Sequence, residues 1–273
     1  MSKRSHPVSI ARVRGHLRET ADDQVATEEP LEIRVGHVNG GMRRTDSVSI
    51  TMRTPGEDED LAVGFLFSEG IIHSPADIAI VKPCSGDNTV RVELDESVAV
   101  DLGRLTRHFY ATSSCGVCGK ASLEALYAEG TRMIDSTMRT GHDVLVGLPH
   151  SLRQAQTTFA ATGGLHAAAA FTADGELVVV REDVGRHNAV DKVIGALLRA
   201  GRLPAADLGL VVSGRASFEL MQKAAVAGMP MLAAVGAPSS LAVELAREFN
   251  VTLVGFLRGT SFNVYAGEER ITG

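Results

Sequence analysis

The 273-residue sequence contains no tryptophan, and its aromatic share is only 4%. Proteins that bind single-stranded nucleic acid stack the bases on aromatic side chains, so this scarcity argues against that class. The net charge of −6 also argues against a general binder of nucleic-acid backbones. No uninterrupted apolar run approaches the roughly 18–20 residues of a membrane-spanning helix. We therefore expect a protein that binds neither nucleic acid nor membrane.

Cysteine is almost as scarce, with Cys84, Cys115 and Cys118 as the whole complement. Three cysteines are too few, and too unevenly placed, for the disulfide framework of a small secreted domain. The first twenty residues contain no continuous apolar segment of the kind that a secretory signal requires. Residues 22–29 include four acidic side chains, unlike a transit peptide. The sequence therefore predicts a cytoplasmic protein.

What is present indicates a globular fold, because 44% of the residues are hydrophobic and 22% are charged. We interpret residues 1–28, which are polar, as a flexible tail. Residues 29–110 form a predicted β-rich subdomain, with Asn39-Gly40-Gly41 as a hairpin signal between two alternating stretches. Residues 57–69 have the spacing of a helix that ends before Gly70. Residues 111–141 hold a C-x-x-C loop and a following helix.

Residues 142–267 alternate between strand and helix patterns. We expect a helix over residues 149–160 with Pro149 in its first turn, strands over 166–172 and 176–181, and a helix capped by Asn188. Strands over 208–212, 231–235 and 251–256 then alternate with helices over 216–227 and 240–249. This order predicts an α/β fold (α+β overall) in which a mixed, largely parallel sheet carries helices on both faces.

Three predicted strands end in loops of small residues and arginines: 213–215, 236–240 and 255–261. Ligands of open α/β sheets bind beyond the carboxyl ends of the parallel strands. Small residues let the backbone approach a ligand, and arginines favour phosphate. Ordinary strand-to-helix turns have the same composition, so each loop taken alone leaves both interpretations open. The convergence of three such loops on one edge favours a ligand site.

The stretch EDVGRHN, residues 182–188, gathers ionisable side chains in a predicted strand-to-helix turn. One interpretation is a solvated charge cluster at the start of a capped helix. The other is the polar wall of a site in which Arg186 and His187 contact an anionic ligand. His166, which follows Gly163-Gly164 at the start of a strand, is more often structural than functional in such a position.

The clearest local motif is SSCGVCGK, residues 113–120, which runs into a predicted helix over 121–129. A cysteine at a helix start beside Lys120 should have a lowered pKa and a reactive thiolate, although two inert buried cysteines would match the spacing too. A structural zinc site needs four ligands, and a zinc deaminase needs H-x-E before P-C-x-x-C, which the sequence lacks. A thioredoxin-type motif lies near the start of a βαβ unit, which is not the context here. Transfer of a sulfur atom by this pair of cysteines is chemically possible, but the residues alone do not choose it over the other interpretations.

Several stretches together form a recognisable pattern: residues 64–72, 115–119, 162–169, 182–192, 213–217 with 222–223, and 253–256 with 263–265. In this order they resemble the FdhD family of sulfur-carrier proteins required for formate dehydrogenase activity. The likeness extends from about residue 28 to the C-terminus.

This resemblance implies a cytidine-deaminase-like α/β scaffold and a homodimeric sulfurtransferase. It implies that Cys115 accepts sulfur from a cysteine desulfurase as a persulfide, with Cys118 as the accompanying thiol. The sulfur would pass to the molybdenum (or tungsten) cofactor, bis-molybdopterin guanine dinucleotide, which serves formate dehydrogenase; a guanine nucleotide would mimic part of it. The alternative is a non-catalytic chaperone that binds this cofactor and apo-formate dehydrogenase.

The resemblance also implies that the cofactor contacts lie in the segment after the last predicted strand, to which the strand-end residues add. The predicted cofactor-binding residues are Phe256, Leu257, Arg258, Gly259, Thr260, Ser261, Ser213, Arg215 and His187. Family members often carry an arginine where this chain has Thr260-Ser261, so phosphate contacts are expected to fall to Arg258. No metal ligand is predicted, and Cys84 matches no motif of the family.

Overall fold

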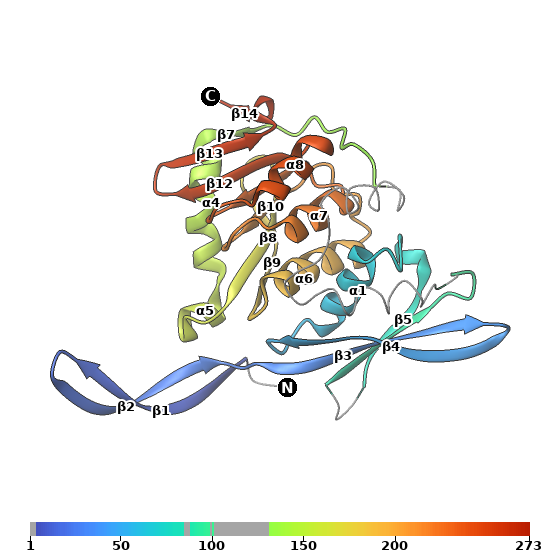
Figure 1. Cartoon of the computed structure of the whole chain (residues 1–273), viewed down its shortest axis with the longest axis horizontal. Coiled ribbons are helices and arrows are strands. Elements are labelled where there is room, and N and C mark those ends of the chain that lie inside the picture. The colour runs from blue at the N-terminus through green and yellow to red at the C-terminus, as the bar shows by residue number, and fades with distance from the viewer. Residues whose placement is uncertain (1–3, 85–87, 99, 101–130) are drawn as a thin grey trace.

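The structure is a computed structural model that describes residues 4–84, 88–98, 100 and 131–273 (Figure 1). Both cysteines of the C-x-x-C motif lie outside these residues. The described strands form a six-stranded sheet, a four-stranded sheet and two two-stranded sheets. None of the described helices is long and apolar enough to cross a membrane.

The six-stranded sheet has the strand order β13-β12-β11-β10-β8-β9. Its strands are β8 (His166–Phe171), β9 (Leu177–Asp183), β10 (Gly209–Val212), β11 (Met231–Ala234), β12 (Thr252–Arg258) and β13 (Ser261–Ala266). The sheet is mixed, as predicted: β10, β11 and β12 pair in parallel, whereas β8, β9 and β13 join by antiparallel pairing. The parallel part is narrower than the predicted "largely parallel" sheet because two hairpins, β8–β9 and β12–β13, form its edges.

Helices cover both faces of this sheet, which confirms the predicted layers (Figure 1). On one face, α4 (His142–Ala155) buries its leucines against Ala167, Ala169 and Phe171 of β8. On the other face, α6 (Arg186–Arg199) packs against β8, and Ala168 and Ala170 share one buried cluster with residues of α6, α7 (Phe218–Val226) and α8 (Ser240–Glu248). Successive residues of a strand point to opposite faces, and the small alanine side chains let helices approach closely on both.

Two helix boundaries differ from the predicted ones. The helix predicted over 149–160 begins at His142, and Pro149 lies inside it rather than in its first turn. The helical spacing of apolar residues begins before the predicted start of the helix, because the buried residues of α4 are Leu145, Leu148 and Leu152. A separate short helix, α5 (Thr157–Thr162), follows. The predicted cap Asn188 is a buried residue within α6, whose N-cap is Gly185.

The N-terminal sheet has the order β4-β3-β6-β5 and contains the predicted hairpin. Its strands are β3 (Glu29–Asn39), β4 (Met42–Arg53), β5 (Ile78–Pro83) and β6 (Thr89–Leu94). Gly40 and Gly41 form the turn with positive φ angles of 61° and 76°, a conformation that glycine adopts without strain. The predicted helix is α1 (Asp58–Ser68), and Gly70 follows it at φ 69°, as a C-terminal glycine should.

Helix α1 joins the two large sheets into one body, because it packs on the N-terminal sheet and against α6. Apolar residues of α1, of both sheets and of α6 belong to a single buried cluster. The two helices approach so closely that a Cβ on Gly64 would lie 1.8 Å from the carbonyl oxygen of Asp191. A Cβ on Gly195 would lie 1.9 Å from the carbonyl oxygen of Asp60. Only glycine at both positions permits this crossing.

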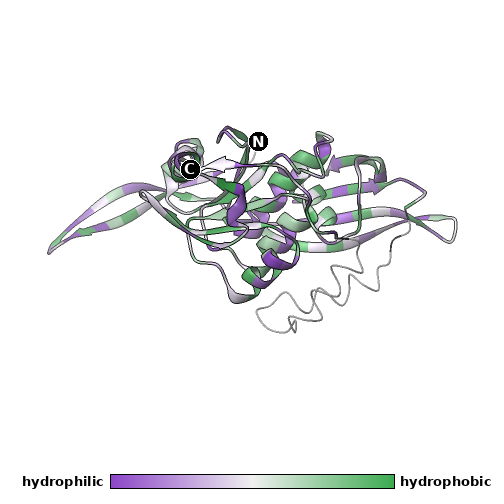
Figure 2. Ribbon diagram, turned by 90° about the horizontal axis from the view of Figure 1, so that it is seen from above, coloured by the Kyte–Doolittle hydropathy of each residue, from purple (hydrophilic) through white to green (hydrophobic). Residues whose placement is uncertain are grey.

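The segment predicted as a flexible tail forms a hairpin instead, made of β1 (Ser5–Arg14) and β2 (Leu17–Ala26). We call these two strands the arm. Figure 2 shows the arm projecting from the body, with hydrophilic and hydrophobic residues interleaved along it. Near the C-terminus, β14 (Ile271–Thr272) pairs in parallel with β7 (Thr140–Gly141).

Candidate functional site

The two catalytic residues predicted from the motif, Cys115 and Cys118, lie outside the described residues, so their assignment stays a prediction. The remaining cysteine, Cys84, is half-buried and free. Within the part of the chain that the structure describes, no group of three or more His, Cys, Asp or Glu side chains could hold a metal ion.

The three loops that follow β10, β11 and β12 meet at one edge of the six-stranded sheet, as predicted. The amide of Gly236 donates to the carbonyl of Gly214 at 2.9 Å, and the amide of Phe256 donates to the carbonyl of Gly236 at 3.0 Å. The amide of Ser239 donates to Ala216 at 3.0 Å. These bonds join the loops in series, so the edge is a preformed surface rather than three separate turns.

A cavity of about 690 Å³ opens at this edge, between the ends of β10 and β11 and the junction of α4 with α5. Such a volume lies in the range of small-molecule sites. Its apolar lining includes Leu152 and Val235, and its polar lining includes His166 and Ser213. The Ser213 hydroxyl oxygen accepts a hydrogen bond from the amide of Ala167 at 2.9 Å, which fixes its position and leaves its own proton available.

Sequence reasoning missed Gln156, which also lines this cavity. Its side chain is only 4% exposed, yet its Nε2 atom has no hydrogen-bond partner. A buried amide without a partner costs free energy, so Gln156 stands out among the residues that line the cavity. Beside it, the guanidinium of Arg153 lies 3.8 Å above the centre of the Phe159 ring. A planar ligand with hydrogen-bond acceptors at its edge would suit this lining.

His166 sits in the cavity as an imidazole whose charge is disfavoured. Burial lowers its pKa below the ordinary 6.5, the positive charges of Arg186 and His187 lower it further, and Asp183 opposes them. His166 therefore lines the cavity as an imidazole that is neutral at pH 7, and whether its role is structural or functional stays a prediction.

We expect the imidazole of His166 to titrate below pH 6.5 in an NMR titration, and Arg186→Gln to raise that pKa toward its ordinary value by removing a nearby cation. Because the pKa is lowered on folding, the free energy of unfolding should fall as the pH drops from 6.5 toward the folded pKa. His166→Gln should remove that part of the acid sensitivity. Arg202→Gln, on the surface, is the control, and an unchanged titration in Arg186→Gln would contradict the assignment.

The predicted contact segment is the end of the β12–β13 hairpin, not a loop after a final strand. Phe256 has a φ angle of 53°, and Gly259 at 60° forms the turn with Thr260. The exposed Arg258 guanidinium lies 5.5 Å from the centre of the Phe256 ring. Leu257, in contrast, is fully buried and packs in the core, so it is not open to a ligand in this structure. Residues at the end of this hairpin, including Ser261, and the exposed Arg215 stand at the same edge as the cavity.

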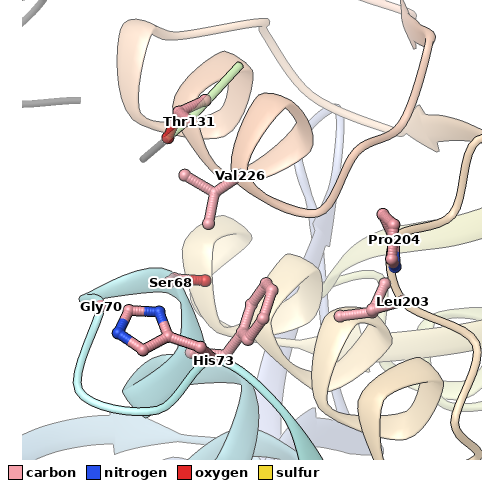
Figure 3. Close-up of a pocket in the computed structure, with 8 residues that line it drawn as sticks. Ser68, Gly70, His73, Thr131, Leu203, Pro204 and Val226 are labelled. Carbon is pink, nitrogen blue, oxygen red and sulfur yellow. The ribbon is translucent and has the colours of Figure 1, made fainter. Parts of the chain in front are cut away.

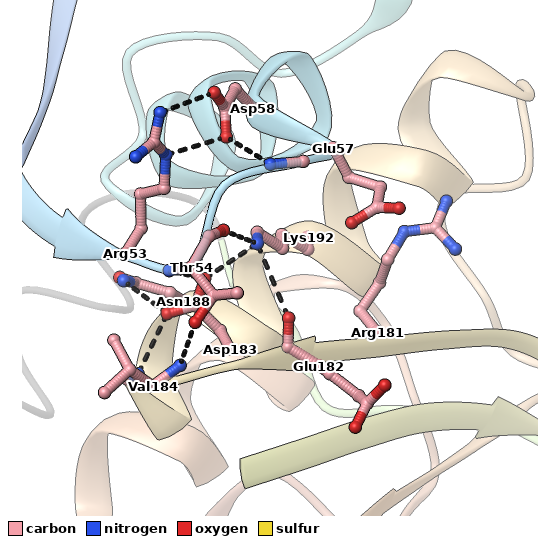
Figure 4. Close-up of polar contacts among 12 residues, drawn as sticks. Arg53, Thr54, Glu57, Asp58, Arg181, Glu182, Asp183, Val184, Asn188 and Lys192 are labelled. Atoms are coloured by element: carbon pink, nitrogen blue, oxygen red, sulfur yellow. Dashed lines mark hydrogen bonds and ion pairs between the residues drawn. The ribbon is translucent and has the colours of Figure 1, made fainter. Parts of the chain in front are cut away.

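The EDVGRHN stretch is not a solvated charge cluster, so that interpretation is wrong (Figure 4). Asp183 and Lys192 are both 0% exposed and form an ion pair of 2.7 Å. Lys192 donates to the carbonyl of Thr54 at 2.9 Å, and the Thr54 amide donates to Asp183 at 3.2 Å. Glu182 accepts hydrogen bonds from the amides of Thr158 and Phe159, at the start of α5. These residues hold the two sheets and α5 in place.

His187 lines a second cavity, of about 630 Å³, between β4, α1 and the starts of α6 and α7. Its Nε2 lies 2.6 Å from Oε2 of Glu219, and this contact lowers the pKa of the Glu219 carboxyl. The structure therefore brings Ser213 and His166 together but places His187 in a neighbouring cavity. The EDVGRHN stretch separates the two, which is why a single site could not be resolved from sequence.

The second cavity also holds a buried amine that sequence reasoning did not single out. Lys223 Nζ lies 2.7 Å from Oδ1 of Asp191, and the Ser68 hydroxyl donates to the same oxygen at 2.9 Å. Burial alone would lower the pKa of Lys223, but the carboxylates of Asp191 and Glu69 outweigh it and raise the pKa. The amine therefore stays charged at physiological pH.

Ser68 also lines a third, smaller cavity of about 220 Å³ (Figure 3). The labelled side chains of His73, Leu203 and Val226 surround it, and Thr131 completes it from the opposite side. Thr131 is the first described residue after the stretch that contains the C-x-x-C motif. The chain that leaves the motif thus joins the body next to α1 and α7.

Comparison with known proteins identifies the family of this chain. The FdhD/NarQ family model matches residues 26–272. A protein named sulfur carrier protein FdhD from Streptomyces avermitilis is 52% identical over 272 residues, covering 96% of this chain and 94% of its own. Its namesake from Sulfurisphaera tokodaii is 44% identical and covers 97% and 98%.

A crystal structure from Desulfotalea psychrophila, described as a formate dehydrogenase accessory protein, superposes with a TM-score of 0.77. It covers 99% of this chain and 100% of its own, and its 24% identity makes it a comparison of fold alone. The sequence matches extend through the strand ends, the cavity lining and the C-x-x-C motif. This chain is a member of the FdhD/NarQ family.

Proposed function

We propose that this chain is a sulfur carrier that receives sulfur on Cys115 and delivers it to the molybdenum cofactor of formate dehydrogenase. The observation that carries the proposal is the 52% identity with a protein named sulfur carrier over nearly the whole chain, in a sequence that holds Cys115 and Cys118 within the family match. Glycines on both sides of Cys118 and the adjacent Lys120 suit a reactive thiol.

The receiving step is a thiol exchange that needs no external oxidant or reductant. The Cys115 thiolate attacks the outer sulfur of a persulfide on a cysteine desulfurase, a new S–S bond forms, and the old one breaks. The desulfurase leaves as a thiolate, and Cys115 becomes the persulfide. Cys118, three residues on, can attack the inner sulfur of the Cys115 persulfide: a Cys115–Cys118 disulfide forms, the bond to the outer sulfur breaks, and the outer sulfur leaves as hydrosulfide for the cofactor. A reducing thiol then returns the disulfide to two thiols.

The cofactor is the substrate of the second step, and the described residues fit one heterocyclic end of it. The cavity of about 690 Å³ offers the Ser213 hydroxyl and a neutral His166. Exposed Arg215 and Arg258 supply positive charge for phosphates at the same edge of the sheet. A guanine nucleotide is the natural probe for this site, because the bis-guanine-dinucleotide form of the cofactor ends in that group.

Mass spectrometry after incubation with a cysteine desulfurase and cysteine tests the first step. We expect one added sulfur atom on the wild-type chain and none on Cys115→Ala, with a loss of formate dehydrogenase activation of at least about a hundredfold, as expected for a nucleophile. Cys84→Ala is the matched control, since Cys84 is half-buried and lies outside the C-x-x-C motif, and should behave as wild type. Sulfur addition that survives in Cys115→Ala would contradict the proposal.

The chaperone alternative rests on the cavity, whose described lining contains no cysteine. A chaperone that only binds the cofactor and apo-formate dehydrogenase would use that cavity and no thiol. The discriminating result is Cys115→Ala with intact guanine-nucleotide binding: if it still activates formate dehydrogenase, the chaperone is the correct function, and if activation is lost, the sulfur carrier is.

A further inference from the structure

The arm is an unusual feature because little of it touches the rest of the chain as far as the structure describes it. Its base is held by the amide of Thr27, which donates to the carbonyl of Arg4 at 2.9 Å, and by an ion pair of Arg4 with Glu57. Near the base it also meets α5, where Gln24 and Thr157 line a common cavity. Beyond that, β1 and β2 pair with each other and with no other described strand. The FdhD/NarQ match begins at residue 26, so the arm lies outside the part that defines the family.

An isolated two-stranded hairpin is marginally stable in water, because three or more strands are usually needed to hold a sheet. The unpaired edges of the arm also present backbone donors and acceptors that can pair with another strand. A partner strand would supply what the arm lacks. The charges of the arm indicate which strand that is.

The charges of the arm are separated along its length. Residues 12–18 contain three arginines and no acidic residue, whereas residues 19–23 contain three acidic residues and no basic one. Arg18 and Asp22, both exposed on β2, have no hydrogen bond or ion pair with any other described residue. Strand β2 therefore has a basic end and an acidic end, and a second β2 running antiparallel places opposite charges side by side.

The backbone of β2 permits this pairing. Arg14 and Leu17 are opposite each other and close the turn at Gly15, so the two of them form a hydrogen-bonded pair. Along β2, residues whose backbone N–H and C=O groups bond to β1 then alternate with residues whose N–H and C=O groups point away from β1. Arg18, Thr20 and Asp22 belong to the second set. They form a free edge of the arm.

Only one register of two β2 strands suits the charges. When a twofold axis relates two antiparallel copies of one strand, the axis passes between the two copies of a single residue. Residues that face each other then lie equally far before and after that residue, so their two numbers add up to an even value. We use this sum to name each register. A sum of 40 puts Thr20 on the axis and Arg18 opposite Asp22 twice. The other registers bring like charges together. A sum of 38 places the two copies of Glu19 opposite each other, a sum of 42 places Glu19 opposite Asp23, and a sum of 44 places the two copies of Asp22 opposite each other. Strand β1 has arginines but no acidic residue, so its edge is not complementary to itself.

We propose that the arms of two copies of this chain pair through their β2 strands, in the register that sets Arg18 against Asp22, to form a four-stranded antiparallel sheet. The interface is isologous, since the same edge contributes from both copies. A uniform polyanion such as a nucleic acid or an anionic lipid surface would attract residues 12–18 but repel residues 19–23. The pairing does not depend on the sulfur-carrier proposal.

Charge reversal in the full-length chain tests the register by sedimentation velocity at low salt. Arg18→Asp and Asp22→Arg each replace two attractive pairs by two repulsive ones, so each should raise the dissociation constant of the dimer about tenfold or more. The double variant Arg18→Asp/Asp22→Arg restores attraction and should return to within about threefold of wild type. Single variants that sediment as wild type does, or a double variant that fails to recover, would argue against the pairing unless another interface holds the dimer.

Disulfide trapping detects the pairing of the two arms themselves, so its result holds even if a second interface also keeps the dimer together. In a chain whose three native cysteines are serine, Thr20→Cys should form a covalent dimer rapidly on mild oxidation, since the two copies of residue 20 face each other on the axis. Leu17→Cys is as exposed but lies six residues from its own copy in this register, and it should cross-link at least about tenfold more slowly. Equal rates for the two variants, or no cross-link at residue 20, would overturn the proposal.

Discussion

Replacing Lys192 by methionine should lower the free energy of unfolding by about 3–5 kcal/mol, because the carboxylate of Asp183 is then left buried without its cation. Both side chains are 0% exposed, and 2.7 Å separates Nζ from Oδ2. The three remaining donors to Asp183, the amides of Thr54 and Gly185 and the side chain of Asn188, are neutral and compensate the charge only in part. Urea denaturation followed by circular dichroism measures the loss.

The matched control is Arg202→Met, which removes the cation of another ion pair. Arg202 and Asp207 are 3.1 Å apart, but their side chains are 39% and 73% exposed. An exposed pair of this kind contributes no more than about 1 kcal/mol. The double variant Lys192→Met/Asp183→Asn should regain part of the lost stability, since no buried charge is left unpaired. Equal effects of Lys192→Met and Arg202→Met would show that burial of the pair does not matter.

Gly64→Ala and Gly195→Ala are each expected to destabilise the protein by about 3 kcal/mol or more, the upper end for overpacking a buried site. The new methyl group would lie 1.8 Å or 1.9 Å from a backbone carbonyl oxygen of the opposite helix, and a backbone cannot rotate aside as a side chain can. The helices α1 and α6 would have to separate, and the apolar cluster that they share would lose contacts.

Gly147→Ala provides the comparison, because Gly147 lies inside α4 with nothing within 4 Å of the added Cβ. Alanine is the better helix former, so this variant should gain up to about 1 kcal/mol in the same denaturation experiment. If all three glycine variants changed stability alike, helix propensity rather than the close crossing would be the cause.

Most of the core of the fold could be predicted from the sequence, because apolar residues recur along the core helices and strands with the spacing typical of each. The hairpin at Asn39-Gly40-Gly41, the helix before Gly70 and the parallel strands β10 to β12 all follow local rules. The arm was missed because neither face of it is buried, and an exposed sheet need not alternate apolar with polar residues. Local patterns also could not show that Gly64 and Gly195 touch, since that contact depends on the packing of distant helices.

The candidate site was predictable in outline and not in detail. The rule that ligands gather beyond parallel strands predicted that the loops of Ser213 and Arg215 lie at the edge where the strand-end loops meet, and the structure has them there; their binding role stays a prediction. Gln156 was missed because it was placed inside a continuous helix, whereas it lies at the break between α4 and α5 with φ −81° and ψ 80°. The structural roles of Asp183 and Lys192 could not be distinguished from the role of His187 by sequence alone. The difference is that Asp183 and Lys192 are buried, and the burial of a charged residue depends on the packing of distant elements.

The contacts between α1 and α6 have a consequence for how the chain is made. Ser68 of α1 and Asp191 of α6, which bond to each other, stand 123 positions apart in the sequence. At a synthesis rate of about 5–20 residues per second, α1 waits on the ribosome for roughly 6–25 s before its partner helix appears. During that time the side chains of Leu61 and Leu66, both buried in the finished protein, have no α6 to cover them. Nascent chains of this protein should therefore be clients of chaperones that hold exposed apolar segments until synthesis passes α6.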